Sequence, residues 1–296
     1  MNPADSLIHL EPHHKYLVAI DSDGCAFDSM EIKHKECFIP NIIKHWGLQS
    51  VSKYARSAAE FVNLYSKWRG INRFPALIMT LDLLREWPDV IRREVDVPVA
   101  QPVRDWITRE TKLGNPALQA EVGQTGDPVL KQALTWSKAV NESVADMVHD
   151  VPPFPYVRKS LEAISEFADI IVCSSTPGEA LEREWNEHDL DRFVRVIAGQ
   201  EMGSKREHLK FASDGKYHPD RVIMIGDAPG DRSAAEENGL HFYPINPGSE
   251  DQSWERFLLE TSTRFRNDQY TEEYQKELND AFEKLLPEFP PWVAVT

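Results

Sequence analysis

Short apolar runs recur along the chain, one near its start and four in its second half. They are rich in β-branched or aromatic residues, and polar residues or glycine bound each run. Such runs are typical of strands buried on both faces of a parallel sheet. The predicted strands are "KYLVAI" (15–20), "DIIVCSS" (169–175), "VRVIAG" (194–199), "RVIMIGD" (221–227) and "LHFYPI" (240–245).

Helix-compatible segments separate the later runs. They are "PYVRKSLEAISEFA", "GEALEREWNEHDL", "SKREHLKFA" and "DRSAAEENG". Strands that alternate with helices predict an α/β fold in which helices cover both faces of a Rossmann-like parallel sheet.

The segment from about 30 to 150 has helical patterns and no convincing strand. Its first helix is predicted to begin at Asp28, with Glu31 completing a capping box, and to end at Gly47. A second helix is predicted in "SAAEFVNLYSKWRG", which runs to Gly70. The proline-rich "DVPPFPYV" (150–157) resembles a stiff hinge.

These patterns predict two domains, one inserted into the other. The α/β core comprises 1–30 and 152–296, and the helical insert comprises 31–151. The amphipathic stretch 250–296 is expected to form a helical tail that packs on the core or on a second subunit. Both a monomer and a homodimer remain open.

Composition narrows the range of partners. The chain of 296 residues has 33 basic and 48 acidic residues, a net charge of -15. This charge repels nucleic acid and anionic lipid, so neither is an expected partner. The sequence has no signal-peptide pattern and no long apolar run, so we expect a soluble cytoplasmic protein. Its three cysteines show no metal-site or disulfide spacing.

Acidic residues follow two of the predicted strands. Asp21 and Asp23 follow the first strand, and Asp227 and Asp231 follow the strand that ends near Ile225. Ligands of parallel sheets bind at the carboxyl ends of strands. Carboxylates gathered there need a cation, and ligation by oxygen alone favours Mg²⁺ and therefore a phosphoryl substrate.

Four ordered motifs resemble those of the haloacid dehalogenase-like hydrolase superfamily. They are "DSDGCAFD", "IIVCSST", "GSKREHL" and "VIMIGDAPGDRSAAEENG". The helical insert resembles the type 1 cap of that superfamily, as in phosphoglycolate phosphatase-like and β-phosphoglucomutase-like members. The resemblance covers roughly 15–30 and 152–245, so it leaves the tail unexplained.

The resemblance implies a role for each matching residue. Asp21 would be the nucleophile, Asp23 the general acid and base, Ser174 a hydrogen-bond donor to the phosphoryl group, and Lys205 a compensating charge. The metal would be held by Asp21, by the Asp23 backbone carbonyl and by Asp227, with Asp231 beside it.

Each of these residues also has a purely structural interpretation. The aspartates are common turn and cap residues, and Asp231 is well placed to cap a helix. Lys205 could be a solvated helix-end lysine, since Arg206 and His208 lie close by. Ser174 competes with Ser175 for the phosphoryl group, and Ser175 or Thr176 could cap the next helix instead.

Asp23 narrows the reaction class, because members of the superfamily that cleave carbon–halogen or carbon–phosphorus bonds generally lack a carboxylate at this position. Phosphate ester hydrolysis or phosphoryl transfer is therefore expected. The chain departs from the family at Cys25, where threonine is usual, and a thiol is the weaker donor.

Substrate choice is expected to lie in the cap. "WRGINRFPALIMTLDLL" (68–84) resembles the specificity loop of β-phosphoglucomutase-like caps. This resemblance makes Arg69, Asn72 and Arg73 candidate substrate-binding residues, although the arginines could equally be surface charges. Ser175, which competes with Ser174 for the phosphoryl group, is a further candidate substrate-binding residue. The long stretch 86–130 is expected to reshape the pocket.

Together these observations predict a Mg²⁺-dependent phosphatase of a small phosphorylated metabolite. The alternative reaction is that of a phosphosugar mutase. A non-catalytic binding protein on the same fold is a third hypothesis.

Overall fold

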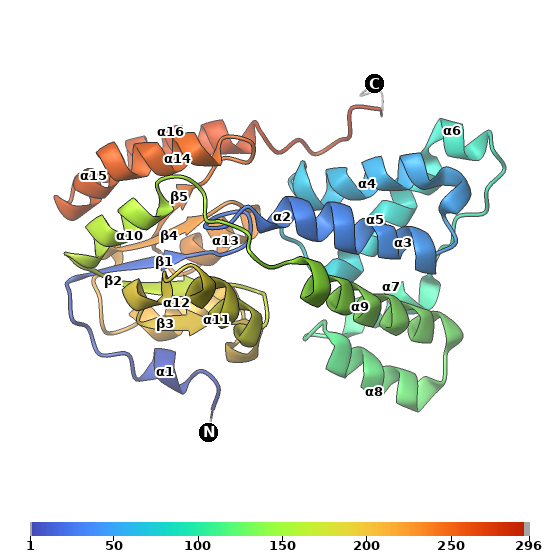
Figure 1. Cartoon of the computed structure of the whole chain (residues 1–296), viewed down its shortest axis with the longest axis horizontal. Helices are drawn as coiled ribbons and strands as arrows, with labels where there is room; N and C mark the ends of the chain where they lie inside the picture. Colours follow the sequence, from blue (N-terminus) through green and yellow to red (C-terminus); the bar gives the residue numbers. More distant parts are fainter. Residues whose placement is uncertain (1, 293–296) are drawn as a thin grey trace. The chain divides into compact units, whose positions relative to one another are not determined.

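The computed structural model describes residues 2–292 and divides into two compact units. The first unit, called the sheet unit, comprises Met1–Met30 and Asp150–Leu285. The second, called the helical unit, comprises Glu31–His149 and Leu286–Thr296. The helical unit is thus inserted after the first strand of the sheet unit (Figure 1).

The sheet unit is built on one five-stranded sheet in the order β3-β2-β1-β4-β5. Every strand pair is parallel, and Ile20 of β1 lies opposite both Val172 of β2 and Ile225 of β4. The strands are β1 (Tyr16–Ile20), β2 (Ala168–Cys173), β3 (Val196–Ala198), β4 (Val222–Gly226) and β5 (His241–Pro244). All five predicted strands are confirmed, as is the α/β fold class.

Helices cover both faces of this sheet. Alternate residues of β1, including Val18 and Ile20, pack in one cluster with Leu161 of α10 and Trp254 of α14. In Figure 1, α10, α14 and α16 lie on one side of the sheet and α12 on the other. The helices of this unit are α1 (Asp5–Ile8), α10 (Val157–Ser165), α11 (Gly178–Glu187), α12 (Lys205–Ser213), α13 (Pro229–Glu236), α14 (Glu250–Arg256), α15 (Ser262–Arg266) and α16 (Glu272–Glu283).

Short helical turns complete the sheet unit. Three are 3₁₀ turns and one is a π-helix that joins α14 to α15. They are Asp191–Phe193, Gln200–Met202, Pro219–Arg221 and the π segment Phe257–Thr261.

The helical unit contains no strand among its described residues. It is organised around Phe74, which makes edge-to-face contacts with Trp106 at 5.0 Å and Trp136 at 6.0 Å. Its elements are α3 (Ile39–His45), α4 (Ser52–Leu64), α5 (Arg73–Glu86), α6 (Pro88–Ile91), α7 (Gln101–Arg109), α8 (Asn115–Thr125) and α9 (Pro128–Met147), with a 3₁₀ turn at Gln49–Val51.

The first predicted helix is confirmed as one continuous helical run. It consists of α2 (Ser29–Ile32), a π segment (Lys33–Phe38) and α3, and Gly47 follows with a positive φ of 68°. The second helix ends earlier than predicted. α4 stops at Leu64 rather than continuing to Gly70, and Tyr65 is its C-cap.

The end of the chain differs from the expected tail. α14 to α16 belong to the sheet unit, but residues 286–292 belong to the helical unit, and the last four residues of that tail lie outside the described residues. Trp292 stacks on Trp87 at 4.2 Å, and the carbonyl of Pro287 accepts the N–H of Lys67. The C-terminal segment is therefore anchored in the helical unit by aromatic contact.

Over residues 2–292, none of the helices combines the length and the apolar character that crossing a bilayer requires.

Candidate active site

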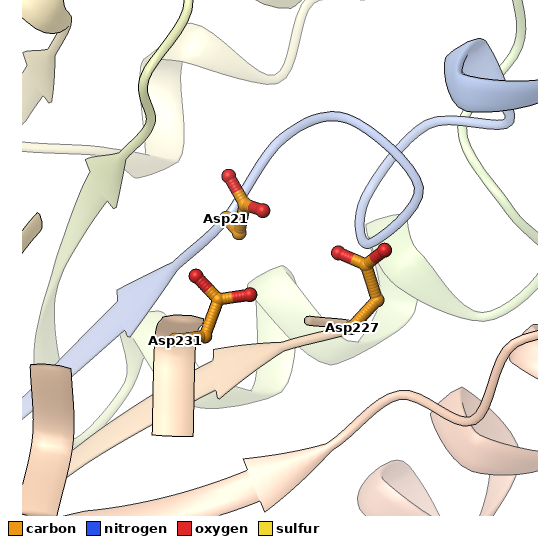
Figure 2. Close-up of side chains that lie close together, drawn as sticks. All are labelled: Asp21, Asp227 and Asp231. Carbon is orange, nitrogen blue, oxygen red and sulfur yellow. The ribbon is translucent and has the colours of Figure 1, made fainter. Parts of the chain in front are cut away.

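The candidate active site lies at the carboxyl ends of β1 and β4. Asp21 follows β1 directly, and its N–H donates to the carbonyl of Ile225 at 3.0 Å. Asp227 follows β4, so the parallel pairing brings both aspartates to one edge of the sheet. Figure 2 shows the side chains of Asp21, Asp227 and Asp231 close together, and one carboxylate oxygen of each lies within 4.8 Å of the others.

Asp231 is not the N-cap of α13, which is Ala228, but it bonds to the start of that helix and to Lys205. It lies in the first turn of α13, where its Oδ2 accepts the N–H of Ala228 at 3.1 Å. Its Oδ1 accepts from the Nζ of Lys205 at 2.5 Å. Only glycine allows this approach, because a Cβ on Gly226 would lie 2.5 Å from Asp231 Cβ.

Lys205 is held inside the acidic group by its helix. It is the first residue of α12, whose start is fixed by a capping box between Ser204 and Glu207. Its Nζ lies 2.7 Å from Asp21 Oδ2 as well as contacting Asp231, and its side chain is only 16% exposed. The interpretation as a solvated lysine is therefore wrong.

The neighbours of Lys205 in the sequence point elsewhere. Arg206 is exposed and pairs with Glu237 at 3.0 Å, and His208 is fully buried. Burial, together with the charge of Lys205, lowers the pKa of His208 to about 4. Neither residue competes with Lys205 for contact with the carboxylates.

The cluster of Asp21, Asp227, Asp231 and Lys205 contains three carboxyl groups and one amine. Burial raises the pKa of Asp21 to about 6, against the opposing effect of Lys205, and Asp231 adds to the rise. Burial also raises the pKa of Asp231. Burial alone would lower the pKa of Lys205, but its two carboxylate partners outweigh that effect and keep the pKa above its usual range.

The donor set fits a hard cation. Asp21, Asp227 and Asp231 are buried and offer only oxygen atoms, which are the ligands that Mg²⁺ and Ca²⁺ take in proteins. One lysine does not neutralise three carboxylates, so a divalent ion would relieve the remaining repulsion.

Asp23 lies in a tight loop that follows β1. Gly24 has a φ of 74°, and its N–H donates to the carbonyl of Phe27 at 2.8 Å. This left-handed conformation is easy only for glycine. The carboxylate of Asp23 accepts hydrogen bonds from the hydroxyls of Ser29 and Thr176.

Ser22, between the two aspartates, was not identified from the sequence. Its N–H donates to Asp21 Oδ1 at 2.8 Å, and its buried hydroxyl donates to Glu184 at 2.8 Å while accepting from the indole N–H of Trp185 at 3.0 Å. The partners lie 162 and 163 positions away, so no local spacing signals this contact.

The serines after β2 separate into two environments. Ser174 is buried, and its hydroxyl accepts the N–H of Thr176 at 3.2 Å. Ser175 is exposed. The predicted cap by Ser175 or Thr176 is wrong, because α11 begins at Gly178 with Pro177 as its N-cap and no side-chain cap.

Cys25, the departure from the family pattern, is fully buried beneath the site. Its Sγ donates to the carbonyl of Ile225 at 3.6 Å, so the thiol still supports the end of β4. This contact involves the same carbonyl that accepts the N–H of Asp21.

The cap residues named from the sequence lie in the helical unit. Arg69 is buried and donates to the carbonyl of Leu64 at 3.0 Å, and Asn72 caps α5 by accepting the N–H of Phe74 at 3.0 Å. Arg73 is half-buried. The three residues come from one short segment but have different surroundings.

The guanidinium of Arg73 meets only neutral acceptors among the described residues. It donates to the carbonyl of Ser137 at 3.1 Å, to its hydroxyl at 3.0 Å and to Asn141 at 2.6 Å, and it lies 4.9 Å from the centre of the Phe38 ring. Burial lowers the pKa of Arg73 to about 10. A partly desolvated cation without a carboxylate partner is suited to binding an anion.

Residues 110–245 match the family model described as haloacid dehalogenase-like hydrolase. This match confirms the resemblance over residues 110–245, and the matched family is one of hydrolases. The matched range includes Ser174, Lys205 and both acidic residues after β4, but it begins after the loop that carries Asp21 and Asp23. No curated protein matches the chain.

Several solved structures are similar to the chain. One is a haloacid dehalogenase-like family hydrolase from Streptococcus pneumoniae, at 14% identity and a TM-score of 0.44, with 81% of this chain and 90% of the other covered. A superfamily hydrolase of subfamily IA from Geobacter sulfurreducens has 16% identity, a TM-score of 0.40 and coverage of 77% and 86%. A protein described as a predicted phosphoglycolate phosphatase from Haemophilus somnus has 16% identity, a TM-score of 0.40 and coverage of 77% and 84%.

Proposed function

We propose that this haloacid dehalogenase-like hydrolase is a Mg²⁺-dependent phosphatase of a small phosphorylated metabolite. The proposal rests on the buried cluster of three carboxylates and one lysine at the carboxyl ends of β1 and β4. In this cluster, Asp21 Oδ2 lies 2.7 Å from Lys205 Nζ, and the Asp21 carboxylate lies close to those of Asp227 and Asp231. A carboxylate beside a buried cation, with a second carboxylate two residues on, is suited to nucleophilic catalysis on a phosphate ester.

In the first step, an Asp21 carboxylate oxygen attacks phosphorus, and the bond from phosphorus to the ester oxygen breaks. Asp23 gives its proton to that oxygen, so the product leaves as an alcohol. Lys205 and the hydroxyl of Ser174 stabilise the charge on the phosphoryl oxygens. The result is an aspartyl-phosphate on Asp21.

In the second step, a water molecule attacks the same phosphorus and gives its proton to Asp23. The bond from phosphorus to Asp21 breaks, inorganic phosphate leaves, and both aspartates return to their starting states. Splitting the reaction in this way lets one carboxylate act first as acid and then as base.

Asp21, Asp227 and the backbone carbonyl of Asp23 would hold Mg²⁺, with Asp231 beside it. When bound, the ion would offset negative charge on the nucleophile and the phosphoryl group.

A panel of phosphorylated metabolites, assayed with Mg²⁺ for released phosphate, tests the proposal. We expect phosphate release from at least one small phosphate ester. Conversion of a sugar phosphate to its isomer without phosphate release would instead indicate a mutase. Binding without turnover across the panel would indicate a binding protein and contradict the proposal.

We further propose that Arg73 binds a distal anion of the substrate. Arg73→Ala should raise KM for the substrate found in the panel by about 10- to 100-fold, because a charged hydrogen bond contributes about 1.5–3 kcal/mol. It should hardly change KM for p-nitrophenyl phosphate, which has no second anion. Steady-state kinetics on both substrates provide the measurement.

Arg92→Ala is the matched control, since the Arg92 side chain is 69% exposed in the same unit. Thermal unfolding of both variants checks that losing the contacts to Ser137 and Asn141 has not unfolded the helical unit. Equal loss on both substrates, or no loss on either, would remove Arg73 from the binding site.

A further inference from the structure

The carboxylate of Asp23 is held on both of its oxygens. Thr176 donates its hydroxyl to Asp23 Oδ2 at 2.7 Å, and the hydroxyl of Ser29 donates to Oδ1. Thr176 comes from the loop between β2 and α11, 153 positions from Asp23 in the sequence. A carboxylate that accepts at both oxygens has one preferred orientation of its plane, because rotation would break both hydrogen bonds.

The backbone of Thr176 is fixed on both sides. Its N–H donates to the hydroxyl of Ser174 at 3.2 Å, and its carbonyl accepts the N–H of Gln200 at 3.0 Å. Threonine is branched at Cβ, which restricts rotation about its Cα–Cβ bond and therefore the position of its Oγ1. The direction of the hydrogen bond to Asp23 is therefore set by the loop.

The hydroxyl of Thr176 does not cap α11. A threonine just before a helix usually caps it, but α11 begins without a side-chain cap. The same loop thus carries Ser174, the proposed donor to the phosphoryl group, and the Thr176 hydroxyl, which bonds to the proposed general acid.

We infer that Thr176 is a positioning residue that orients the Asp23 carboxylate for proton transfer to the leaving oxygen. The inference rests on the proposed function, since it needs Asp23 to act as general acid. General acid catalysis contributes about 10²- to 10⁴-fold, and a misplacement of about 1 Å can cost about 10²-fold. Losing the hydroxyl should remove a large part of this contribution and leave substrate binding largely intact.

Two aryl phosphates of similar size separate this role from a structural one. Phenyl phosphate expels a strongly basic phenolate that needs a proton, whereas p-nitrophenyl phosphate expels a stabilised anion that needs little help. We expect Thr176→Val to slow the first turnover of phenyl phosphate about 10- to 100-fold and that of p-nitrophenyl phosphate by less than about 3-fold. Thr176→Ser, which keeps the hydroxyl, should restore the phenyl phosphate rate to within about 3-fold.

A double-mutant cycle with Asp23→Asn tests whether Thr176 affects the rate through the Asp23 carboxylate. If Thr176 acts through Asp23, Thr176→Val should cause no further loss on phenyl phosphate in the Asp23→Asn background. An equal loss in both backgrounds would overturn the inference. Equal slowing of both aryl phosphates by a variant with unchanged thermal unfolding would overturn it too, while leaving the proposed phosphatase activity standing.

The proposed function fails separately. Wild-type protein that turns over neither probe nor any ester of the metabolite panel would overturn both claims. If Thr176→Val does not fold, Thr176→Ala takes its place in the same cycle, because it also removes the hydroxyl without adding bulk.

Discussion

Asp21→Asn is expected to lower phosphate ester turnover on the order of 10⁴-fold or more, the scale on which removal of a nucleophile acts. An amide cannot form the aspartyl-phosphate, so no slower version of the same reaction remains. The variant should stay folded, because asparagine has the same shape and its Oδ1 still accepts from Ser22 N–H or Lys205 Nζ. Removing one of three close carboxylate charges also relieves repulsion. Phosphate release and thermal unfolding are the measurements.

Asp220→Asn is the matched control, since the Asp220 side chain is 76% exposed in the same unit. It should keep full activity. Retention of more than about a tenth of wild-type activity by Asp21→Asn would exclude Asp21 as the nucleophile. A beryllium fluoride adduct seen crystallographically on any residue other than Asp21 would exclude it as well.

Removal of divalent metal is expected to lower activity to below about 1% of its starting value, and added Mg²⁺ should restore it. The carboxylates of Asp21, Asp227 and Asp231 are buried close together, and Lys205 contacts two of them, Asp21 and Asp231, so a bound cation would reduce the repulsion among the three. Dialysis against EDTA, followed by titration with Mg²⁺, provides the assay.

Thermal unfolding gives a second readout that does not depend on turnover. An ion that binds only the folded state stabilises it, so Mg²⁺ should raise the Tm of the EDTA-treated protein. At a Mg²⁺ concentration of 100 times its Kd, the free energy of unfolding should rise by about 2.7 kcal/mol. Full activity in a sample shown by metal analysis to be metal-free would rule out the metal requirement.

The candidate site follows partly from sequence because parallel strands end at one edge. Asp21 and Asp227 each follow an apolar run directly, and those runs are the adjacent strands β1 and β4. The carboxyl ends of neighbouring parallel strands must meet, so a pattern along the chain predicts proximity in space. Lys205 and Ser174 were found from motif order rather than from this geometry.

Helix ends were predicted less well than strands. α4 stops at Leu64 although its apolar pattern continues to Trp68, and α11 begins at Gly178 without the hydroxyl cap that the sequence offers. In each case a helical pattern or a capping residue is a weak local preference that packing can override.

The fold class, the five strands and the carboxylates at their ends could be predicted from the sequence, because each depends on residues that are neighbours along the chain or on the shared direction of the strands. The contacts between distant segments are seen only in the tertiary structure. The hydroxyl of Thr176 bonds to Asp23 across 153 positions, and that of Ser22 bonds to Glu184 across 162. Trp292 packs on Trp87 in the helical unit, although α16, the helix that precedes Trp292, belongs to the sheet unit. No periodic pattern or fixed spacing in the sequence predicts such contacts, because the packing of strands and loops decides which distant residues meet.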